Sequence, residues 1–462
     1  MARGKKAVKE LSPEEKLQQA LVPVEEQPYL IPENWCWVRL GKLYEINPKV
    51  TADNAALASF VPMERIESGM TGRFTFEIQS WEKARKNHTQ FADGDVAFAK
   101  ISPCFENQKS MIVQGLKNGI GGGTTELIIL RQAYMNQKYT FLLISTEDFV
   151  SQGKATYSGT VGQQRISMDF VREYPVPVPP LPEQHRIVSR IESLFAKLDE
   201  AKETAQAVVD GFELRKSAIL HKAFTGELTE RWRKEHGVGL ESWTDTTIGE
   251  QAELITKGAS PRWQGVEYTD DKSQTLFVTS ENVREGYLNF TKEKYLSNKI
   301  NDIQKRSILN YGDVLVNIVG ASIGRAAIYN LHQLANTNQA VCIIRLKSGI
   351  SNEFVCTYLN APIAQSYYYD NKVETARANI SLGSISAMYI NLPTSAEQKE
   401  IVDTLNMVLE MEQQAKGAAE AVLSQIDTMK KAILARAFRG ELGTNDPKEE
   451  WAGELVRTYL PK

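Results

Sequence analysis

Most of the common catalytic patterns fail among the side chains that could do chemistry in this sequence. The stretch "GIGGGTTE" (Gly119 to Glu126) lacks the lysine of a phosphate-binding loop, and we expect a flexible turn between strands. The stretch "DEAK" (Asp199 to Lys202) contains the acidic-x-lysine fragment of some nucleases, but its position in a helical segment favours a solvated charged face. No HExxH motif is present. These residues favour a binding or scaffold protein over a catalyst.

Metal and disulfide chemistry is equally poorly supported by the cysteines and histidines. The four cysteines, Cys36, Cys104, Cys342 and Cys356, are scattered without a CxxC pair. The five histidines make no ligand spacing with them. We therefore expect neither a zinc site nor a disulfide framework, but buried or half-buried thiols in a reducing compartment.

Polar loops with basic side chains, Asn, Gln and Gly are the chemistry that the chain does offer. Arginine can bind guanine, and Asn or Gln can bind adenine, through two hydrogen bonds, while Lys and Ser bind phosphates. In the first half of the chain the candidate DNA-contacting residues are Lys83, Arg85, Lys86, Lys100, Asn107, Lys109, Gln163, Gln164 and Arg165. In the second half they are Lys257, Arg262, Trp263, Asn317, Arg325, Asn338, Arg377 and Asn379. Each such loop, taken alone, is also typical of an ordinary solvated connection.

The charge balance limits how such loops could bind nucleic acid. The formal net charge is −3. Residues 31–180 carry 16 Lys and Arg against 15 Asp and Glu, and residues 240–394 carry 14 against 15. An autonomous DNA binder driven by electrostatics has a basic excess, which neither segment shows. DNA binding would therefore need local patches, with partners supplying further phosphate contacts.

A long helix that occurs twice is the element that must position these loops. The segment Glu183 to Leu228 aligns without a gap with Glu397 to Leu442, 214 residues further on. Apolar residues recur at alternating spacings of four and three, which predicts a coiled-coil seam. The first copy has the seam residues Ile187, Ile191, Leu194, Leu198, Ala201, Ala205, Val208 and Phe212, with Phe224 near its end. The second has Ile401, Leu405, Val408, Ala415, Ala419, Val422 and Ile426, with Phe438 near its end.

The ends of the two helices and their pairing can also be predicted. A proline run keeps the chain extended before the first copy, Glu183 complements the positive helix end, and Gly226 and Gly440 fit the stops. Glu412 replaces Leu198 on the second seam and needs a partner or water. We expect the two helices to pair antiparallel as a coiled coil with pseudo-twofold symmetry. The alternative is that each helix packs on its own domain.

The repeat extends into the regions before each helix. The stretches "GDVAFAKI" and "FVPMERIESG" in the first half correspond to "GDVLVNIV" and "FVTSENVREG" in the second, and each is typical of a strand running into a turn. A tryptophan and a glycine six residues apart begin each half, at Trp35 and Trp243. The predicted fold class is therefore α+β, with two mixed α/β domains, each followed by a long helix.

Two short terminal segments complete the predicted organisation. Ser12, Pro13 and Glu15 predict a capped helix near the start, and "EEWAGELVRTYL" predicts another near the end. The predicted segments are an N-terminal extension at 1–30, domains at 31–180 and 240–394, a helix with linker at 181–239, a helix at 395–442 and a tail at 443–462. Because no apolar run is long enough to span a membrane and the start lacks a signal-peptide core, we expect a cytoplasmic protein without membrane contact.

The doubled helix carries a family resemblance. "YPVPVPPLPEQHRIV" before a helix ending "AFTGELTERWR", repeated as "EQKEIV" and "AFRGEL", resembles the specificity subunit of a Type I restriction-modification system, as do the Trp-led domain starts and the paired "GDV" strands. The resemblance covers the chain from about Leu11. The second copy departs from it by reading "LPTSAEQ" in place of the proline run.

The resemblance implies a non-catalytic DNA-recognition subunit. Each domain would be a target-recognition domain for one half of a split sequence in double-stranded DNA. The paired helices would act as a spacer and bind two methyltransferase subunits, and restriction subunits would join them. S-adenosylmethionine, ATP and Mg would then be bound by partner subunits, with no cofactor in this chain. Two alternatives remain open: a duplicated coiled-coil assembly protein whose domains bind protein or glycan, and a fused nuclease or methyltransferase.

Overall fold

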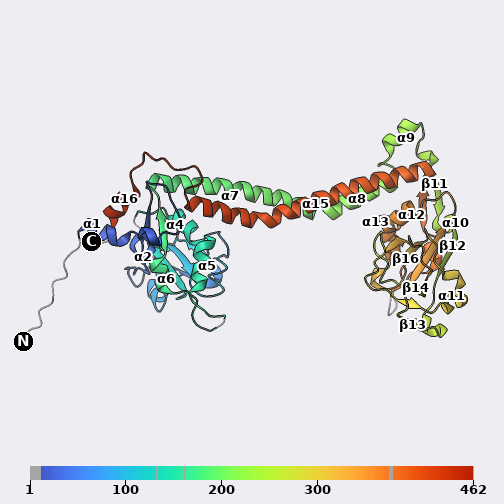
Figure 1. Cartoon of the computed structure of the whole chain (residues 1–462), viewed down its shortest axis with the longest axis horizontal. Helices are drawn as coiled ribbons and strands as arrows, with labels where there is room; N and C mark the ends of the chain where they lie inside the picture. Colours follow the sequence, from blue (N-terminus) through green and yellow to red (C-terminus); the bar gives the residue numbers. More distant parts are fainter. Residues whose placement is uncertain (1–11, 132–133, 161, 374–377, 461–462) are drawn as a thin grey trace, which may run out of the picture. The chain divides into compact units, whose positions relative to one another are not determined.

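The computed structural model describes residues 12–131, 134–160, 162–373 and 378–460, drawn in sequence colours in Figure 1. The chain divides into two compact units. The first joins Met1–Thr204 to Val422–Lys462, and the second is Ala205–Ala421. Each unit thus contains a sheet-bearing domain and part of both long helical segments. The segments predicted from the sequence are consecutive stretches of the chain, whereas these units join stretches that are close in space. The predicted segment boundaries therefore stay a prediction.

Two four-stranded sheets form the centre of the first unit. Its strands are β1 (Cys36–Arg39), β2 (Glu45–Ile46), β3 (Leu57–Val61), β4 (Glu77–Ser80), β5 (Thr89–Ala92), β6 (Val96–Ala99), β7 (Ser110–Ile112), β8 (Ile120–Gly123), β9 (Leu127–Arg131) and β10 (Pro175–Val178). One sheet has the order β2-β9-β6-β7 and is antiparallel. The other has the order β4-β3-β8-β5, with β3 and β8 parallel. The separate pair β1-β10 joins the start of the domain to the segment before the long helix.

Short helices surround these sheets, and helices from both ends of the chain pack together. They are α1 (Pro13–Ala20), α2 (Leu40–Leu43), α3 (Trp81–Arg85), α4 (Gln137–Ile144), α5 (Glu147–Ala155), α6 (Met168–Glu173) and α16 (Ala452–Tyr459). Both predicted terminal helices are confirmed, and Ser12 and Glu15 form the expected capping box. Leu17 of α1 and Val456 of α16 share one buried core. The C-terminal tail is therefore part of the first unit.

The second unit repeats this frame with different residues. Its strands are β11 (Thr244–Thr247), β12 (Ala252–Lys257), β13 (Tyr268–Thr269), β14 (Thr275–Val278), β15 (Tyr295–Leu296), β16 (Val314–Asn317), β17 (Ala326–Ile328), β18 (Ala335–Thr337), β19 (Val341–Leu346) and β20 (Tyr389–Leu392). The sheet β12-β19-β16-β17 corresponds to β2-β9-β6-β7, and the pair β11-β20 to β1-β10. In the sheet β13-β15-β14-β18, the parallel pair β14-β18 corresponds to β3-β8. The predicted α+β class and the repeated strand pairs are confirmed.

The helices of the second unit follow the same order. They are α9 (Glu230–His236), α10 (Ile248–Gln251), α11 (Lys299–Ile303), α12 (Asn352–Asn360), α13 (Pro362–Asn371) and α14 (Leu382–Ser386). Leu359 of α12 and Ile385 of α14 lie in the core that also contains the inward residues of β16. The corresponding core of the first unit contains Leu143 of α4 and Val171 of α6. The same layers thus cover both central sheets.

The glycine-rich stretch is a strand, so its prediction as a flexible turn is wrong. Gly121, Gly122 and Gly123 belong to β8, in the interior of its sheet. A Cβ atom at Gly122 would lie 2.0 Å from the carbonyl oxygen of Ala84 in α3, and one at Gly123 would lie 2.5 Å from the carbonyl oxygen of Val61. The glycines are there because neighbouring backbone approaches the strand closely, and not because the chain must turn.

The two copies of the long helix differ in continuity. The first is divided into α7 (Leu181–Asp210) and α8 (Phe212–Phe224), whereas the second is the unbroken α15 (Ser395–Phe438). The division falls at Gly211, where the second copy has Gln425. Glycine weakens a helix, and the guanidinium of Arg215 donates to the carbonyl oxygen of Val208 across the break. Both copies end just before a glycine with positive φ, as predicted.

The helical segments pair antiparallel within each unit. In the first unit Ile191 of α7 packs in the same core as Ala437 of α15, and Lys430 forms a 2.6 Å ion pair with Asp199. In the second unit Phe224 of α8 shares a core with Leu405 of α15. Residue numbers rise along one segment as they fall along the other, so the predicted antiparallel pairing is confirmed within each unit. Because the ends of each segment also pack on the adjacent domain, the alternative arrangement is partly present too.

Three residues of the predicted seam are exposed. Val422 is 42% exposed, so its assignment to the buried seam is wrong, and Leu423 is the half-buried residue there. Ala201 and Ala415 are also exposed. Glu412 has the partner that its position requires: the Nε atom of Arg215 lies 2.8 Å from Glu412 Oε2. Arg215 therefore contacts both the helix break at Gly211 in the first copy, through Val208 O, and Glu412 in the second copy.

The cysteines lie where the sequence suggested. All four are free, with Cys36, Cys342 and Cys356 buried and Cys104 half-buried. Burial raises the pKa of each of the three buried thiols to about 12. Within the described residues, His, Cys, Asp and Glu form no group of three that could hold a metal ion. No helix in this part of the chain is long and apolar enough to cross a membrane.

Candidate nucleic-acid interface

A tryptophan–glutamate hydrogen bond anchors each long helix to its own domain. The indole Nε1 of Trp35 donates to Glu183 Oε2 at 2.7 Å in the first unit. Trp243 donates to Glu397 Oε2 at 2.8 Å in the second. Both carboxylates are fully buried. The glutamate expected to complement the helix end is thus chiefly the buried acceptor for the tryptophan that begins the domain.

The glutamine after each glutamate fixes a second helix. The side-chain oxygen of Gln184 accepts a 2.8 Å bond from the amide of Asn136, which caps α4. Gln398 accepts an equal bond from the amide of Ser351, which caps α12. The repeated "EQ" therefore locks the long helix to the domain start and to one covering helix. Sequence reasoning missed these roles, although the paired tryptophans and the repeated "EQ" were the available signal.

Different segments complete the two anchors. Glu183 also accepts bonds from Thr444 and Asn445 of the C-terminal tail, at 3.3 and 2.9 Å. Burial raises the pKa of the Glu183 carboxyl, and the bond from Trp35 opposes that rise. In the second unit the guanidinium of Arg233 lies 2.6 Å from Glu397 Oε1, and Arg233 is only 5% exposed. The two anchors thus differ in charge: one is a buried carboxyl whose hydrogen-bond donors are neutral, and the other is a buried ion pair.

A repeated set of backbone hydrogen bonds brings two loops together beside the central sheet. In the first unit the amide of Lys100 donates to Glu126 O, that of Ser102 to Gln164 O, and that of Ile166 to Lys100 O. The corresponding donors in the second unit are the amides of Ile318, Gly320 and Ile380, which bond to Ala340 O, Ala378 O and Ile318 O. The loop after β6 or β16 is thereby joined to the loop before α6 or α14. This two-loop frame, defined by those bonds, holds many of the predicted DNA-contacting residues.

In the first unit the frame gathers basic and amide side chains around Glu126. Arg165 forms two hydrogen bonds to the Glu126 carboxylate, at 2.9 and 2.7 Å. This pairing lowers the pKa of Glu126, and the charge of Lys100 lowers it further. Gln163 is exposed and Gln164 is half-buried. Glu126 is a frame residue that the sequence did not point to, because its partner lies 39 residues away.

Other predicted residues of the first unit lie outside this group. Lys109 is half-buried, and its Nζ donates to the carbonyl oxygen of Met63 at 2.9 Å. Asn107 is exposed on the loop after β6, and its carbonyl accepts from the amide of Gly69. The exposed residues Lys83, Arg85 and Lys86 lie on or just after α3.

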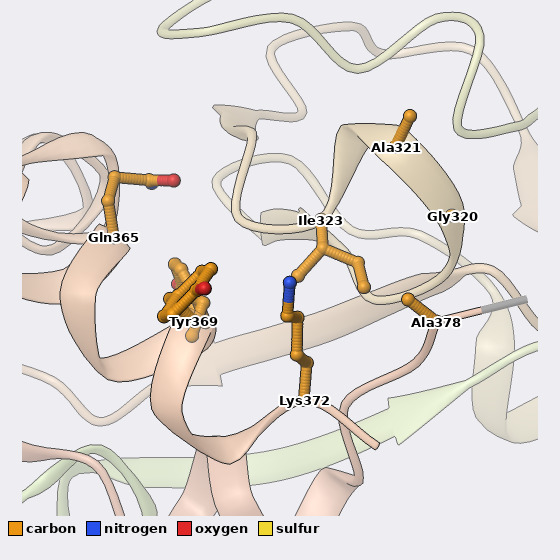
Figure 2. A pocket seen from close by; sticks show the side chains of 8 residues that line it. Gly320, Ala321, Ile323, Gln365, Tyr369, Lys372 and Ala378 are labelled. Carbon is orange, nitrogen blue, oxygen red and sulfur yellow. The ribbon is translucent and has the colours of Figure 1, made fainter. Parts of the chain in front are cut away.

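In the second unit the frame borders two open hollows. Arg325 and Asn338 line one of them, together with Ser322 and Gln339. Arg325 is exposed, and its side chain has no hydrogen bond or ion pair among the residues that the structure describes. Figure 2 shows the other, a pocket of about 510 Å³ in which Lys372 and Tyr369 face the loop at Gly320. The Nζ atom of Lys372 lies 4.2 Å from the centroid of the Tyr369 ring.

The remaining predicted residues of the second unit have different settings. Trp263 is 89% exposed beside exposed Arg262, in the 3-10 helix Pro261–Gln264, and Lys257 is exposed at the end of β12. Asn317 is fully buried, and its amide nitrogen donates to Ser280 O and Ser322 Oγ, so it supports a loop and does not face outward. Asn379 pairs with Val319 and Val373 in the frame. Arg377 lies outside the described residues.

The predicted helix-seam residues are mostly internal to the units. Ile187, Ile191, Phe212, Ile401, Leu405, Ile426, Phe224 and Phe438 are buried, and Leu194, Leu198, Val208 and Val408 are half-buried. These side chains hold the helical segments together and are not free to bind a partner. The exposed apolar residues of the same helices are Leu214, Met407, Met411, Val422 and Met429.

Comparison with known proteins agrees with this arrangement. A family model described as "Type I restriction modification DNA specificity domain" matches residues 32–209 and 241–420. The chain is 38% identical over 217 residues to the Type I restriction enzyme EcoAI specificity subunit of Escherichia coli, which covers 46% of this chain and 37% of that protein. It is 35% identical over 237 residues to the EcoEI specificity subunit of the same species, with 50% and 39% covered. These matches span less than two thirds of each relative's length.

Solved structures show the same fold. The crystal structure of the HsdS subunit from Thermoanaerobacter tengcongensis matches 90% of this chain and 100% of its own length, with a TM-score of 0.67 at 20% identity. A chain from a structure on complex assembly and conformational transition of a Type I restriction-modification system matches the same shares with a TM-score of 0.57. At this identity the likeness shows the fold alone.

Proposed function

We propose, since the chain belongs to the family of Type I restriction-modification DNA specificity domains, that it is the DNA-recognition subunit of such a complex. The two domains would each bind one half of a split target in double-stranded DNA. The observation that carries this proposal is the repeated two-loop frame, whose backbone bonds recur while the side chains on it change. Such a frame keeps the position of a base-reading loop while the bases it reads can differ.

The proposal includes partners but no catalysis in this chain. The exposed apolar residues of the paired helices, among them Met407 and Met411, offer a surface on which two methyltransferase subunits could bind. Restriction subunits would join that assembly. S-adenosylmethionine would be bound by the methyltransferase subunits, and ATP and Mg by the restriction subunits. The nearly balanced charge of each domain supports this division, because partners would supply many of the phosphate contacts.

Co-expression with a methyltransferase subunit, in a host without other DNA methylation, tests the proposal. We expect a complex with two copies of that subunit per copy of this chain, and methylation at a discontinuous sequence only when both proteins are present. Modified positions can be mapped by sequencing the host DNA. A complex that methylates a continuous sequence, or a methyltransferase subunit that methylates the same sites alone, would contradict it.

A further inference from the structure

The ion pair between Arg165 and Glu126 differs from two other Arg–carboxylate pairs near the sheets. Arg131 binds Asp95 in the first unit and Arg345 binds Asp313 in the second, each through two hydrogen bonds. Those pairs recur in both units, and both carboxylates are only 1% exposed, which is typical of a structural role. The Arg165–Glu126 pair occurs in the first unit alone, with side chains 43% and 21% exposed.

The Arg165–Glu126 pair lies in the two-loop frame. The corresponding positions in the second unit are Asn379 and Ala340, which follow from the same backbone bonds. There the frame borders the pocket of Figure 2, where Gly320 and Ala378 correspond to Ser102 and Gln164. One position of a common frame therefore carries Arg in one unit and Asn in the other, the side chains that bind guanine and adenine respectively.

The hydrogen bonds of Arg165 leave part of its guanidinium available. A guanidinium has five N–H donors. The Nε and Nη2 atoms each donate to Glu126, and Nη1 donates to the carbonyl oxygen of Gln163 at 3.1 Å. Among the described residues, one N–H group of Nη1 and one of Nη2 have no acceptor, and the Arg165 side chain is 43% exposed. Two N–H groups on the two terminal nitrogens of an arginine can donate to the O6 and N7 acceptors of guanine in the major groove.

We propose that Arg165, held in place by Glu126, binds a guanine in the half of the target that the first unit contacts. Arg165 is then a specificity-determining residue and Glu126 a positioning residue, because the carboxylate fixes the guanidinium before DNA arrives. Preorganisation of this kind reduces the entropy lost when the contact forms. The inference rests on the proposed function, and it assigns a guanine as the base that Arg165 binds.

Sequence mapping of the methylated sites tests the proposal in the assembled complex. The full chain with Arg165→Gln would be co-expressed with the methyltransferase subunit, and its methylated sequences compared with those of the unchanged complex. We expect one guanine, in only one half of the target, to lose its requirement, while the other half and the spacer stay the same. An Arg165→Gln complex that methylates the unchanged sequence with the same selectivity would overturn the proposal.

Modified DNA provides a second test of the guanine contact, and this test can be made with the unchanged protein. Each guanine in the target is replaced in turn by 7-deazaguanine, which lacks the N7 acceptor, and binding by the unchanged complex is measured. We expect one replacement to weaken binding by about tenfold, since one bidentate contact gives discrimination of that order. The Arg165→Gln complex should be insensitive to the same replacement. If no guanine in the target responds, the proposal fails even where the variant does not fold.

The role of Glu126 is tested by a charge change with a matched control. Glu126→Gln keeps the shape but removes the charge that holds the guanidinium, so we expect weaker discrimination at the same guanine and stronger binding to unrelated DNA. A structural ion pair would instead change the thermal stability and leave the selectivity unaltered. Arg172→Gln is the control, because Arg172 forms an exposed pair with Asp169 in the same unit. If the unchanged complex methylates no discontinuous sequence, the proposed function has failed and not this assignment.

Discussion

At the scale of single residues, the two helix anchors show how one sequence pattern supports two electrostatic states. Trp35 donates a hydrogen bond to Glu183, and Trp243 donates one of nearly the same length to Glu397. Only the second carboxylate has a guanidinium in contact, that of Arg233. Burial without a cation makes ionisation of a carboxyl unfavourable and so raises its pKa. In a buried ion pair, removal of either partner leaves the other charge buried and uncompensated. The same substitution should therefore act differently in the two units.

Glu183→Gln should change the pH dependence of stability. Burial raises the pKa of Glu183 in the folded unit, so its contribution is fully present below the unfolded value of about 4.3 and is lost as pH rises through the folded value. We expect the unfolding free energy of the variant, relative to that of the unmodified chain, to rise between pH 4 and 7. Urea unfolding of the full chain at several pH values measures this difference. A difference that is constant over that interval would be evidence against it.

Glu397→Gln is the matched comparison in the second unit. It leaves the buried guanidinium of Arg233 without its carboxylate, which typically costs about 3–5 kcal/mol. We expect this loss at neutral pH, as a large drop in the urea midpoint. A loss no larger than that of an exposed substitution such as Arg231→Gln would contradict the buried pair, because Arg231 is on the surface of α9.

At the scale of elements, the long helices combine an apolar stripe with one polar contact. Glu412 interrupts the stripe of α15, and Arg215 of α8 binds it while also reaching Val208 O. Periodicity predicted both helices and most of the seam, because heptad spacing is a local property. It could not identify Arg215, since the partner of Glu412 depends on how two distant segments pair. Nor could it predict that the first copy breaks at Gly211.

A double-mutant cycle measures this contact. Arg215→Ala leaves Glu412 half-buried without its cation, and we expect a destabilisation of about 1 kcal/mol, because both side chains are partly solvated. Adding Glu412→Leu, which restores the apolar residue of the first copy, should recover that loss. Thermal denaturation of the four proteins gives the coupling energy. Additive effects would show that the two side chains do not interact.

The glycine strand gives a second prediction at this scale. Gly122→Ala places a Cβ atom 2.0 Å from Ala84 O, a backbone atom that cannot move without displacing α3 from β8. We expect a loss of several kcal/mol and poor soluble yield. Gly417→Ala is the control, because its Cβ meets nothing within 4 Å on the helix and should stabilise by about 0.5–1 kcal/mol. Equal behaviour of the two variants would contradict the close approach.

At the scale of the whole molecule, the sequence repeat predicted the architecture better than it predicted the candidate DNA-contacting residues. The 214-residue offset and the paired motifs predicted two α+β domains with long helices, because a repeat reveals itself by identity alone. The candidate site was found only in part. Arg165 was predicted from its type, but Glu126 emerges only from the fold, and Asn317 proved to be buried. Base-reading side chains are selected by loop geometry, which local patterns do not encode.

We propose that each of the two domains reads one half-site and that the long helices set the length of the spacer between the half-sites. A four-residue insertion after both Ala205 and Ala419 lengthens each helical segment by about 6 Å, close to two base-pair steps. Sequencing of methylated DNA from cells that express this variant with the methyltransferase subunit measures the target directly. The account predicts the same two half-sites separated by a spacer about two base pairs longer. The same half-sites with an unchanged spacer would contradict it.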